Sequence, residues 1–476
     1  MFGRTHITSY TSLKKIAAVA ALGAVALTGI ARQARAQAAA AQPAQPETHY
    51  KDQGEFDAYN AVSMDLIAKN NQKALTDLDT WKQKYPDSWY KDTRATIYVT
   101  TYKDAGQFGK SVDAAGELMA KGDLDATFPD PKSGPPEVLK VLFTTTVAIQ
   151  QTPNPTADEL AIGEKAARKL LDYNRKPADM ADADWTAARP QLQAAAKAAL
   201  LSIAVLPGNL AMAKTPPDCD TAQTVYTKAL ADYPDKSFIS YSLGRAMNCI
   251  ARAHPDKAPD IAPKAIYEFV RAAVTDPTLG GSGDAKKITD YATSAYTTYH
   301  GADDGLEELK TQVKAAALPP ASFTIETATA VANRKQAEFA QSNPQLAMWM
   351  GIKGQLADAA NGVTYFEGTL KNAAVPKLKG TVIEGKPACR SKEILVAVPL
   401  PNAQGAPVSE ISLKLDAALT GKPEAGEIQW EGVPSAFTQS PFLLTMDTEK
   451  AKIEGLKVTP CGAAPARRGG APPKKQ

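Results

Sequence analysis

A single spacing of small, aromatic and proline residues recurs along this chain, and it constrains the fold more than any other feature. The clearest copy follows the pattern A-x3-[FY]-x2-A-x4-P with Ala222, Tyr226, Ala229 and Pro234. Two further copies, the second with two substitutions, are Ala265, Phe269, Ala272 and Pro277, and Ala74, Leu78, Trp81 and Pro86. In a helix, the alanines let a neighbouring helix approach closely, the aromatic residue fills the interface, and the proline ends the helix. The pattern predicts packed pairs of antiparallel helices.

This spacing resembles the second helix of the tetratricopeptide repeat (TPR). Leu243-Gly244 matches the L-G of the family's first helix, and the aromatic and glycine positions of another first helix and its turn are matched by Tyr98, Tyr102, Gly106 and Phe108. The chain departs from the family in its irregular period, in about nine extra residues before Ala265, and in lacking most of the early tryptophans. The resemblance implies an irregular α-hairpin solenoid of five or six hairpins. An unrelated all-helical bundle is the alternative.

The sequence pattern divides the chain into a helical part and a β part. From residue 50 to 361, apolar residues recur at i, i+3, i+4 and i+7, which predicts short amphipathic helices. From residue 362 to 462, short runs of β-branched and aromatic residues alternate with Gly and Pro turns, which predicts a small antiparallel β barrel or sandwich. The expected strands are 363–370, 380–384, 393–398, 410–415, 427–431, 442–446 and 453–458. The stretches GEIQWEGV and PFLLTM resemble an oligonucleotide/oligosaccharide-binding (OB) barrel, and an immunoglobulin-like sandwich fits equally well.

The first 36 residues have the pattern of a signal peptide. Arg4, Lys14 and Lys15 precede an apolar run of about 15 residues, which closes on Ala34-Arg35-Ala36. The run is shorter than the ~20 residues of a membrane-spanning helix, although an uncleaved anchor is the alternative. No other segment is expected to approach that length. We therefore expect a periplasmic or secreted protein with no membrane span after signal cleavage. Residues 37–49 are expected to be a disordered spacer, and residues 463–476 a disordered basic tail.

The net charge gives no reason to expect a nucleic-acid partner. The whole chain carries +3, but five positive residues lie in residues 1–36, so the remainder carries −2. The tail holds four more positive charges, which leaves the folded part near −6. The basic pI therefore reports the two ends of the chain.

The four cysteines allow two disulfides in an exported protein, with three possible pairings. Their positions favour Cys219 with Cys249 and Cys389 with Cys461. If a helical hairpin turns near Pro234, Cys219 and Cys249 lie opposite each other at its open end, where a bridge needs Cα atoms within about 7 Å. Two buried free thiols are the alternative.

Screens for catalytic and metal-binding motifs find no convincing candidate. After the signal region the histidines are His49, His254 and His300, which are far apart and lack coordination spacing. The stretch 380–387 matches G-x4-G-K but ends in Pro387, where a phosphate loop needs Ser or Thr and a following helix. No nucleophile elbow occurs. We expect no catalytic residues, no metal and no cofactor.

The TPR resemblance implies a binding surface along the first helix of a hairpin. Its groove positions fall on Phe238, Tyr241, Arg245 and Asn248. Tyr and Arg are suited to protein interfaces, and packing of Phe238 and Tyr241 between hairpins is the alternative interpretation. The preferred hypothesis is a non-enzymatic periplasmic scaffold that binds another protein or peptide.

The alternative hypothesis places recognition in the β domain. There the protein binds carbohydrate or another small ligand, with aromatic side chains stacking on sugar rings. The candidates are Trp430, Phe437, Tyr365 and Phe366, all of which also suit a barrel core. A hydrolase is a third and more distant reading, because unrelated folds can assemble a site from distant residues.

Overall fold

The computed structural model describes residues 49–398 and 405–461, which form two compact units divided between Glu326 and Thr327. We call them the helical unit and the barrel unit and describe each by itself. The expected signal peptide, nearly all of the spacer at 37–49 and the basic tail at 463–476 lie outside the described residues. So does most of the expected turn at 402–405.

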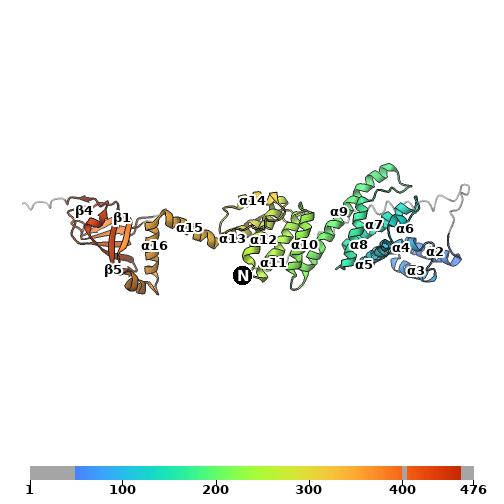
Figure 1. The fold of residues 1–476 in the computed structure, drawn as a ribbon, viewed down its shortest axis with the longest axis horizontal. Coiled ribbons are helices and arrows are strands. Elements are labelled where there is room, and N and C mark those ends of the chain that lie inside the picture. The colour runs from blue at the N-terminus through green and yellow to red at the C-terminus, as the bar shows by residue number, and fades with distance from the viewer. Residues whose placement is uncertain (1–48, 399–404, 462–476) are drawn as a thin grey trace, which may run out of the picture. The chain divides into compact units, whose positions relative to one another are not determined.

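The described part of the helical unit is a series of antiparallel helix pairs, in which consecutive helices pack together (Figure 1). The five hairpins are α2 (Gln53–Ile67) with α3 (Asn71–Lys84), α4 (Lys91–Asp104) with α5 (Phe108–Ala120), α7 (Gly134–Gln151) with α8 (Ala157–Asp172), α9 (Asp182–Ala213) with α10 (Cys219–Asp232), and α11 (Ser237–Ala253) with α12 (Ala258–Thr275). After them, α13 (Ala285–His300) and α14 (Leu306–Ala315) both pack against α12. This arrangement is TPR-like, as the repeated spacing predicted.

The repeated spacing occupies the hairpin interiors. In α10, Ala222, Tyr226 and Ala229 are buried, and the helix ends just before Pro234. Two glycines, one on α9 and one on α11, lie against the aromatic rings that the pattern places on the next helix. A Cβ atom on Gly208 of α9 would lie 2.8 Å from the Tyr226 ring, and one on Gly244 of α11 would lie 2.8 Å from the Phe269 ring. Each aromatic ring therefore fills the space that a missing side chain leaves on the partner helix.

The extra residues between Gly244 and Ala265 lengthen the helices. They extend α11 to Ala253 and start α12 at Ala258, which makes these helices 17 and 18 residues long, against 14 for α3. The turn between them stays short, with His254 as the C-cap of α11. The irregular period therefore reflects longer helices within an otherwise regular hairpin.

Helix α9 corrects one expectation about the chain. It is 32 residues long, and among the described residues it is long and apolar enough to cross a membrane by length and composition alone, with 33% of the stretch concerned buried. The expectation that no segment beyond the signal region approaches spanning length is therefore wrong. Its alanine-rich sequence packs against α7, α8 and α10 through residues such as Ala199, Ile203 and Gly208, so in this fold α9 serves as a repeat helix.

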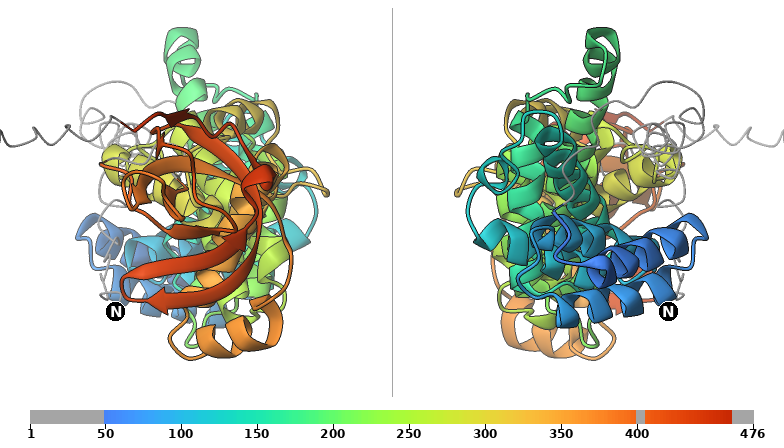
Figure 2. Two further views of the ribbon diagram at one scale, coloured as in Figure 1. Left: turned by 90° about the vertical axis from the view of Figure 1, so that its left-hand side faces the viewer. Right: turned by 90° about the vertical axis from the view of Figure 1, so that its right-hand side faces the viewer.

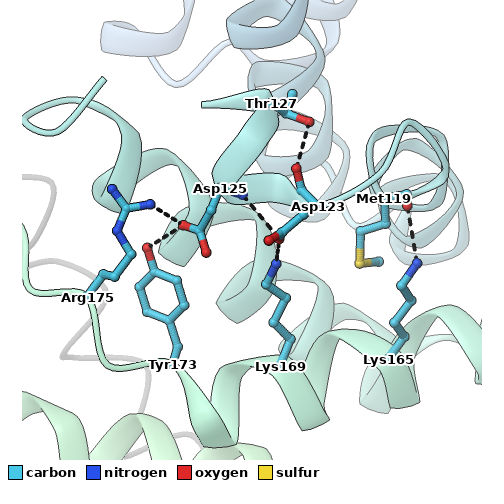
Figure 3. Close-up of polar contacts among 8 residues, drawn as sticks. All are labelled: Met119, Asp123, Asp125, Thr127, Lys165, Lys169, Tyr173 and Arg175. Atoms are coloured by element: carbon cyan, nitrogen blue, oxygen red, sulfur yellow. Dashed lines mark hydrogen bonds and ion pairs between the residues drawn. The ribbon is translucent and has the colours of Figure 1, made fainter. Parts of the chain in front are cut away.

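Charged side chains fix the connection between the second and third hairpins (Figure 3). The short helix α6 (Leu124–Thr127) begins at Asp123, which pairs with Lys169 of α8. Asp125 accepts hydrogen bonds from Arg175 at 2.7 Å and from the Tyr173 hydroxyl at 3.2 Å. The ion pair with Lys169 lowers the pKa of the Asp123 carboxyl. These contacts hold the turn against the end of α8.

The barrel unit is a closed five-stranded barrel with small additions, whose curved strands are drawn in orange and red in the left-hand view of Figure 2. Its strands are β1 (Val375–Lys386), β2 (Glu393–Ala397), β3 (Ile411–Leu415), β4 (Lys422–Pro423), β5 (Glu427–Gln439), β6 (Phe442–Thr448), β7 (Ile453–Glu454) and β8 (Val458–Thr459). The order β1-β2-β3-β6-β5 closes through a β1–β5 pairing, and β3 with β6 is parallel while the other ring pairs are antiparallel. A small five-stranded barrel is typical of the OB fold.

Helices belong to the barrel unit as well. They are α15 (Ala328–Ser342), α16 (Pro344–Ala357), α17 (Gly362–Tyr365), a π-helical turn (Phe366–Leu370) and a 3-10 turn (Lys450–Lys452). Trp349 and Leu356 of α16 enter the barrel core, and the Trp349 indole donates a hydrogen bond to Glu410 at 3.1 Å. The compact units therefore divide earlier in the chain than the change from helix to strand.

The predicted strand at 363–370 is wrong. This segment is α17 followed by the π-helical turn. Phe366 and Leu370, four residues apart, are both buried in the barrel core. A helical turn brings residues four apart onto one face, so packing against the barrel decides the conformation over the β propensity of the segment.

Both predicted disulfides are confirmed. Cys219 at the start of α10 pairs with Cys249 in α11, with Cα atoms 6.0 Å apart. Cys389, between β1 and β2, pairs with Cys461 at the end of the described chain, with Cα atoms 6.1 Å apart. Each bridge lies within one unit.

Candidate functional site

The predicted binding positions lie along α11, between the hairpin interior and the surface. Phe238 and Tyr241 are half-buried and pack against the cluster of Ala272, Leu279 and Ile288 on α12 and the segment after it. Arg245 is exposed, and Asn248, one turn further along, is half-buried. The packing interpretation of Phe238 and Tyr241 therefore applies to part of each side chain, and the exposed part stays available to a ligand.

Aromatic rings from three helices meet around Phe269, and one of them, Tyr241, lies one helical turn before Arg245. Tyr241 of α11 contacts Phe269 of α12 with ring centroids 5.6 Å apart, and Tyr291 of α13 contacts Phe269 at 4.9 Å and Tyr241 at 6.4 Å, all edge to face. Phe269 is buried, whereas Tyr291 is 40% exposed. We call Tyr241, Arg245 and Tyr291 the aromatic–arginine surface.

Burial and the nearby charge of Arg245 determine the electrostatics of this surface. Burial raises the pKa of Tyr241, and the nearby positive charge of Arg245 opposes that rise. Burial also raises the pKa of Tyr226 of α10, to about 12, and the charge of Arg245 again opposes the rise. The Tyr226 hydroxyl donates a hydrogen bond to the exposed Asn209 of α9 at 2.7 Å. Both tyrosines therefore stay neutral hydrogen-bonding groups, and Arg245 supplies positive charge.

Tyr291 is the residue that sequence reasoning missed. It lies on α13, and α13 and α14 do not follow the repeated spacing, so no motif position pointed to it. The available signal was its place in an amphipathic helix that follows the Gly280–Gly283 loop. That signal predicts a helix face without saying which residue lies beside Tyr241.

A second group of aromatic side chains lies on the first hairpin, blue in the right-hand view of Figure 2. Tyr50 contacts Phe56, Tyr59 and Tyr90 with ring centroids 4.7 to 5.6 Å apart. Trp89 packs against Tyr90 at 4.8 Å yet is 65% exposed. Most of this group packs the start of the helical unit together, and Trp89 is its exposed edge.

The carbohydrate alternative loses its main stacking residues. Trp430 and Phe366 are buried in the barrel core, and Phe437 packs on Phe366 with ring centroids 4.8 Å apart. Tyr365 is partly buried against the same core. Trp430 and Phe366 therefore cannot present a ring face to a sugar while the barrel stays folded.

A hollow of about 420 Å³ lies open to solvent at one end of the barrel. Its charged lining consists of Lys414, Asp416, Glu431, Asp447, Glu449 and Lys452. Glu449 pairs with Lys452 at 3.0 Å. The lining contains neither a nucleophilic thiol nor a histidine, and it presents charged groups on a shallow surface.

The histidines and carboxylates do not assemble a metal site within the described residues. No group of three or more His, Cys, Asp or Glu side chains comes together there to hold an ion. His254 caps α11, and His300 ends α13, where its Nδ1 lies 2.8 Å from the Glu326 carbonyl oxygen. The stretch at 380–387 lies almost entirely in β1, where a Cβ on Gly380 would lie 2.6 Å from the Ala397 carbonyl oxygen, so this glycine serves the close approach of two strands.

Comparisons with known proteins give matches only among solved structures. No protein-family model matches the chain, and no curated protein does. One similar chain is the TPR2AB domain of yeast Sti1, solved as a complex with pHSP90, at 15% identity and a TM-score of 0.22. Another is a tetratricopeptide repeat protein from Parabacteroides merdae ATCC 43184, at 10% identity and a TM-score of 0.17. Each match covers 55% of the present chain and 98% of the matched chain. Because both TM-scores lie far below 0.5, the TPR-like assignment rests on the hairpin contacts of this chain.

Proposed function

We propose that this protein is an exported, non-enzymatic scaffold whose helical unit binds another protein or a peptide through the aromatic–arginine surface. The observation that carries the proposal is the cluster of half-buried Tyr241 and 40% exposed Tyr291 around Phe269. The exposed Arg245 follows Tyr241 by one turn of α11, and these helices are held by a folded hairpin core. The signal-peptide pattern of residues 1–36 supports export.

The surface has the physical properties of an interaction site. Tyrosine and arginine give large contact areas, and both are enriched where binding energy concentrates at interfaces. Tyr241 and Tyr291 are already held by ring contacts with Phe269, so binding has little side-chain freedom left to restrict there. The guanidinium of Arg245 is exposed to solvent, where it pairs with a carboxylate or a backbone carbonyl of the partner.

Site-specific photo-cross-linking tests this proposal. A photoreactive phenylalanine analogue replaces Tyr291 in one variant, which keeps an aromatic ring at that position and leaves Arg245 in place. The control variant carries the analogue at Lys228, an exposed position on α10. The full chain is expressed in its native cells and irradiated. We expect discrete adducts at position 291 that are weaker or missing at position 228.

A competing variant makes the test decisive. Adding Arg245→Ala to the position-291 probe removes the exposed cation and leaves the ring contacts with Phe269 in place, and it should reduce the adducts several-fold. Identical adduct patterns at positions 291 and 228, or adducts unaffected by Arg245→Ala, would contradict the proposed surface.

A further inference from the structure

Glu268 of α12 is a buried carboxyl group with no counterpart in the hairpin pattern. Its side chain is 0% exposed, and among the described residues neither carboxyl oxygen has a hydrogen-bond partner. A charged carboxylate in such surroundings is strongly disfavoured, so the group holds its proton. Burial raises the pKa of Glu268 to about 8, against the opposing influence of Ser240 and Arg271.

The neighbouring Arg271 is also buried, and its guanidinium donates hydrogen bonds to groups other than Glu268. It donates hydrogen bonds to Ser240 Oγ of α11 at 2.6 Å, to the Pro234 carbonyl in the turn before α11, and to the Ala316 carbonyl at 3.2 Å. One turn earlier, the Tyr267 hydroxyl donates to the same Ala316 carbonyl at 2.9 Å. The guanidinium beside Glu268 therefore joins three parts of the helical unit.

Ala316 begins an extended segment, residues 316–326, which we call the strap. Leu318 and Phe323 pack against the core shared by α10 to α14, Ile325 is buried, and the Phe323 ring lies 5.1 Å from that of Tyr267. At its far end, the Glu326 carbonyl oxygen lies 2.8 Å from His300 Nδ1. The strap is thus fastened at both ends, and it is the last segment of the helical unit before the barrel unit begins.

We infer that Glu268 and Arg271 form a proton-controlled latch that holds the strap against α12 while Glu268 is neutral and releases it when Glu268 ionises. While Glu268 is neutral, the Arg271 guanidinium donates its hydrogen bonds to the Ala316, Pro234 and Ser240 oxygens. When Glu268 loses its proton, the new carboxylate requires either water or the N–H groups of Arg271. Both outcomes weaken the hold on Ala316.

The other groups around Glu268 do not offer an alternative counterion. Ser240 faces it from α11, and Tyr267 and Arg271 lie on its own helix. Asp235, in the turn before α11, pairs first with Lys236 and is also influenced by Arg271. The contact of α13 with α12 includes the rings of Tyr291 and Phe269 and the side chains of Ile288 and Ala272, none of which is a cation. Arg271 is therefore the cation that responds to ionisation of Glu268.

Hydrogen exchange on the full chain, corrected for the intrinsic effect of pH, tests this latch. In the wild type, protection of the amides of residues 316–326 should fall between pH 5 and 8, by about tenfold per pH unit if release fully solvates Glu268. In Glu268→Gln, which stays neutral, protection should change little over the same range. The exposed Glu308→Gln is the matched control and should behave like the wild type.

Two results would overturn the inference. One is a protection profile for the strap that depends on pH equally in the wild type and in Glu268→Gln. The other comes from infrared difference spectra of the same two proteins at neutral pH, which should contain the band of a protonated carboxyl group. Because that band does not depend on strap motion, its absence contradicts the latch even if Glu268→Gln folds poorly.

Discussion

Gly244 shows how a single residue sets the distance between two helices. The space of its missing side chain is filled by the Phe269 ring, since a Cβ there would lie 2.8 Å from the ring and 3.1 Å from the Ala265 carbonyl oxygen. The sequence motif contains both residues, and the structure supplies the reason that they occur together. The same relation holds between Gly208 and Tyr226, in a hairpin whose first helix shows no clear motif.

Gly244→Ala should therefore destabilise the helical unit despite the better helix propensity of alanine. Forcing a methyl group into a packed interior costs about 1–3 kcal/mol, which exceeds the gain of up to about 1 kcal/mol from removing a helical glycine. Urea unfolding followed by circular dichroism measures the difference. In a Phe269→Leu background the penalty should shrink, and an unchanged penalty there would show that the ring is not the obstacle.

Glu268 gives a second prediction at the residue scale, on global stability. Its pKa rises from an ordinary 4.5 to about 8 on folding, so the folded state holds the proton more tightly than the unfolded state. The resulting stabilisation is complete below the unfolded pKa and is lost as the pH rises toward 8, at about 1.4 kcal/mol per pH unit. Glu268→Gln should gain stability relative to the wild type across that window. Chemical denaturation at pH 5, 6.5 and 8 measures the difference, and parallel curves would contradict the prediction.

At the scale of elements, the sequence predicted the helices, strands and disulfides that a local pattern of residues encodes. The helices of 219–232 and 258–275, the two disulfides and most strands of the barrel follow from periodicity and spacing. The segment 363–370 could not be predicted, because its conformation depends on packing Phe366 and Leu370 into a core made by distant strands. The parallel pairing of β3 with β6 and the exposure of Tyr291 are likewise tertiary properties.

The bridge between α10 and α11 leads to a prediction at this scale. It spans 30 residues and joins the open end of a helix pair. Loop-closure entropy assigns about 3–4 kcal/mol to a cross-link of that length. The double variant Cys219→Ser/Cys249→Ser should lose about that much in the free energy of unfolding, measured by urea denaturation without reductant. If adding reductant destabilises the wild type far less than the substitutions do, the loss comes from the serines instead of from the bridge.

At the scale of the whole molecule, the division into units separates two kinds of surface. The helical unit carries the aromatic–arginine surface and the strap, and the barrel unit closes its own core with α16 and the π-helical turn. The barrel unit begins with α15, in which Val331 is the one buried residue among 15. The sequence could not predict that α15 and α16 group with the barrel, because an amphipathic helix does not specify which core its apolar face joins.

Two separate cores, each with its own disulfide, should unfold in two steps. Differential scanning calorimetry of the chain from residue 37 onward is expected to resolve two transitions. Cys219→Ser/Cys249→Ser should lower only the transition of the helical unit, and Cys389→Ser/Cys461→Ser only that of the barrel unit, because sites without shared contacts act independently. Fragments 49–326 and 327–461 should each reproduce one transition of the full chain. A single transition that both pairs of substitutions shift equally would instead require strong coupling across the boundary at Glu326 and Thr327, for which the exposed helix α15 offers little apolar surface.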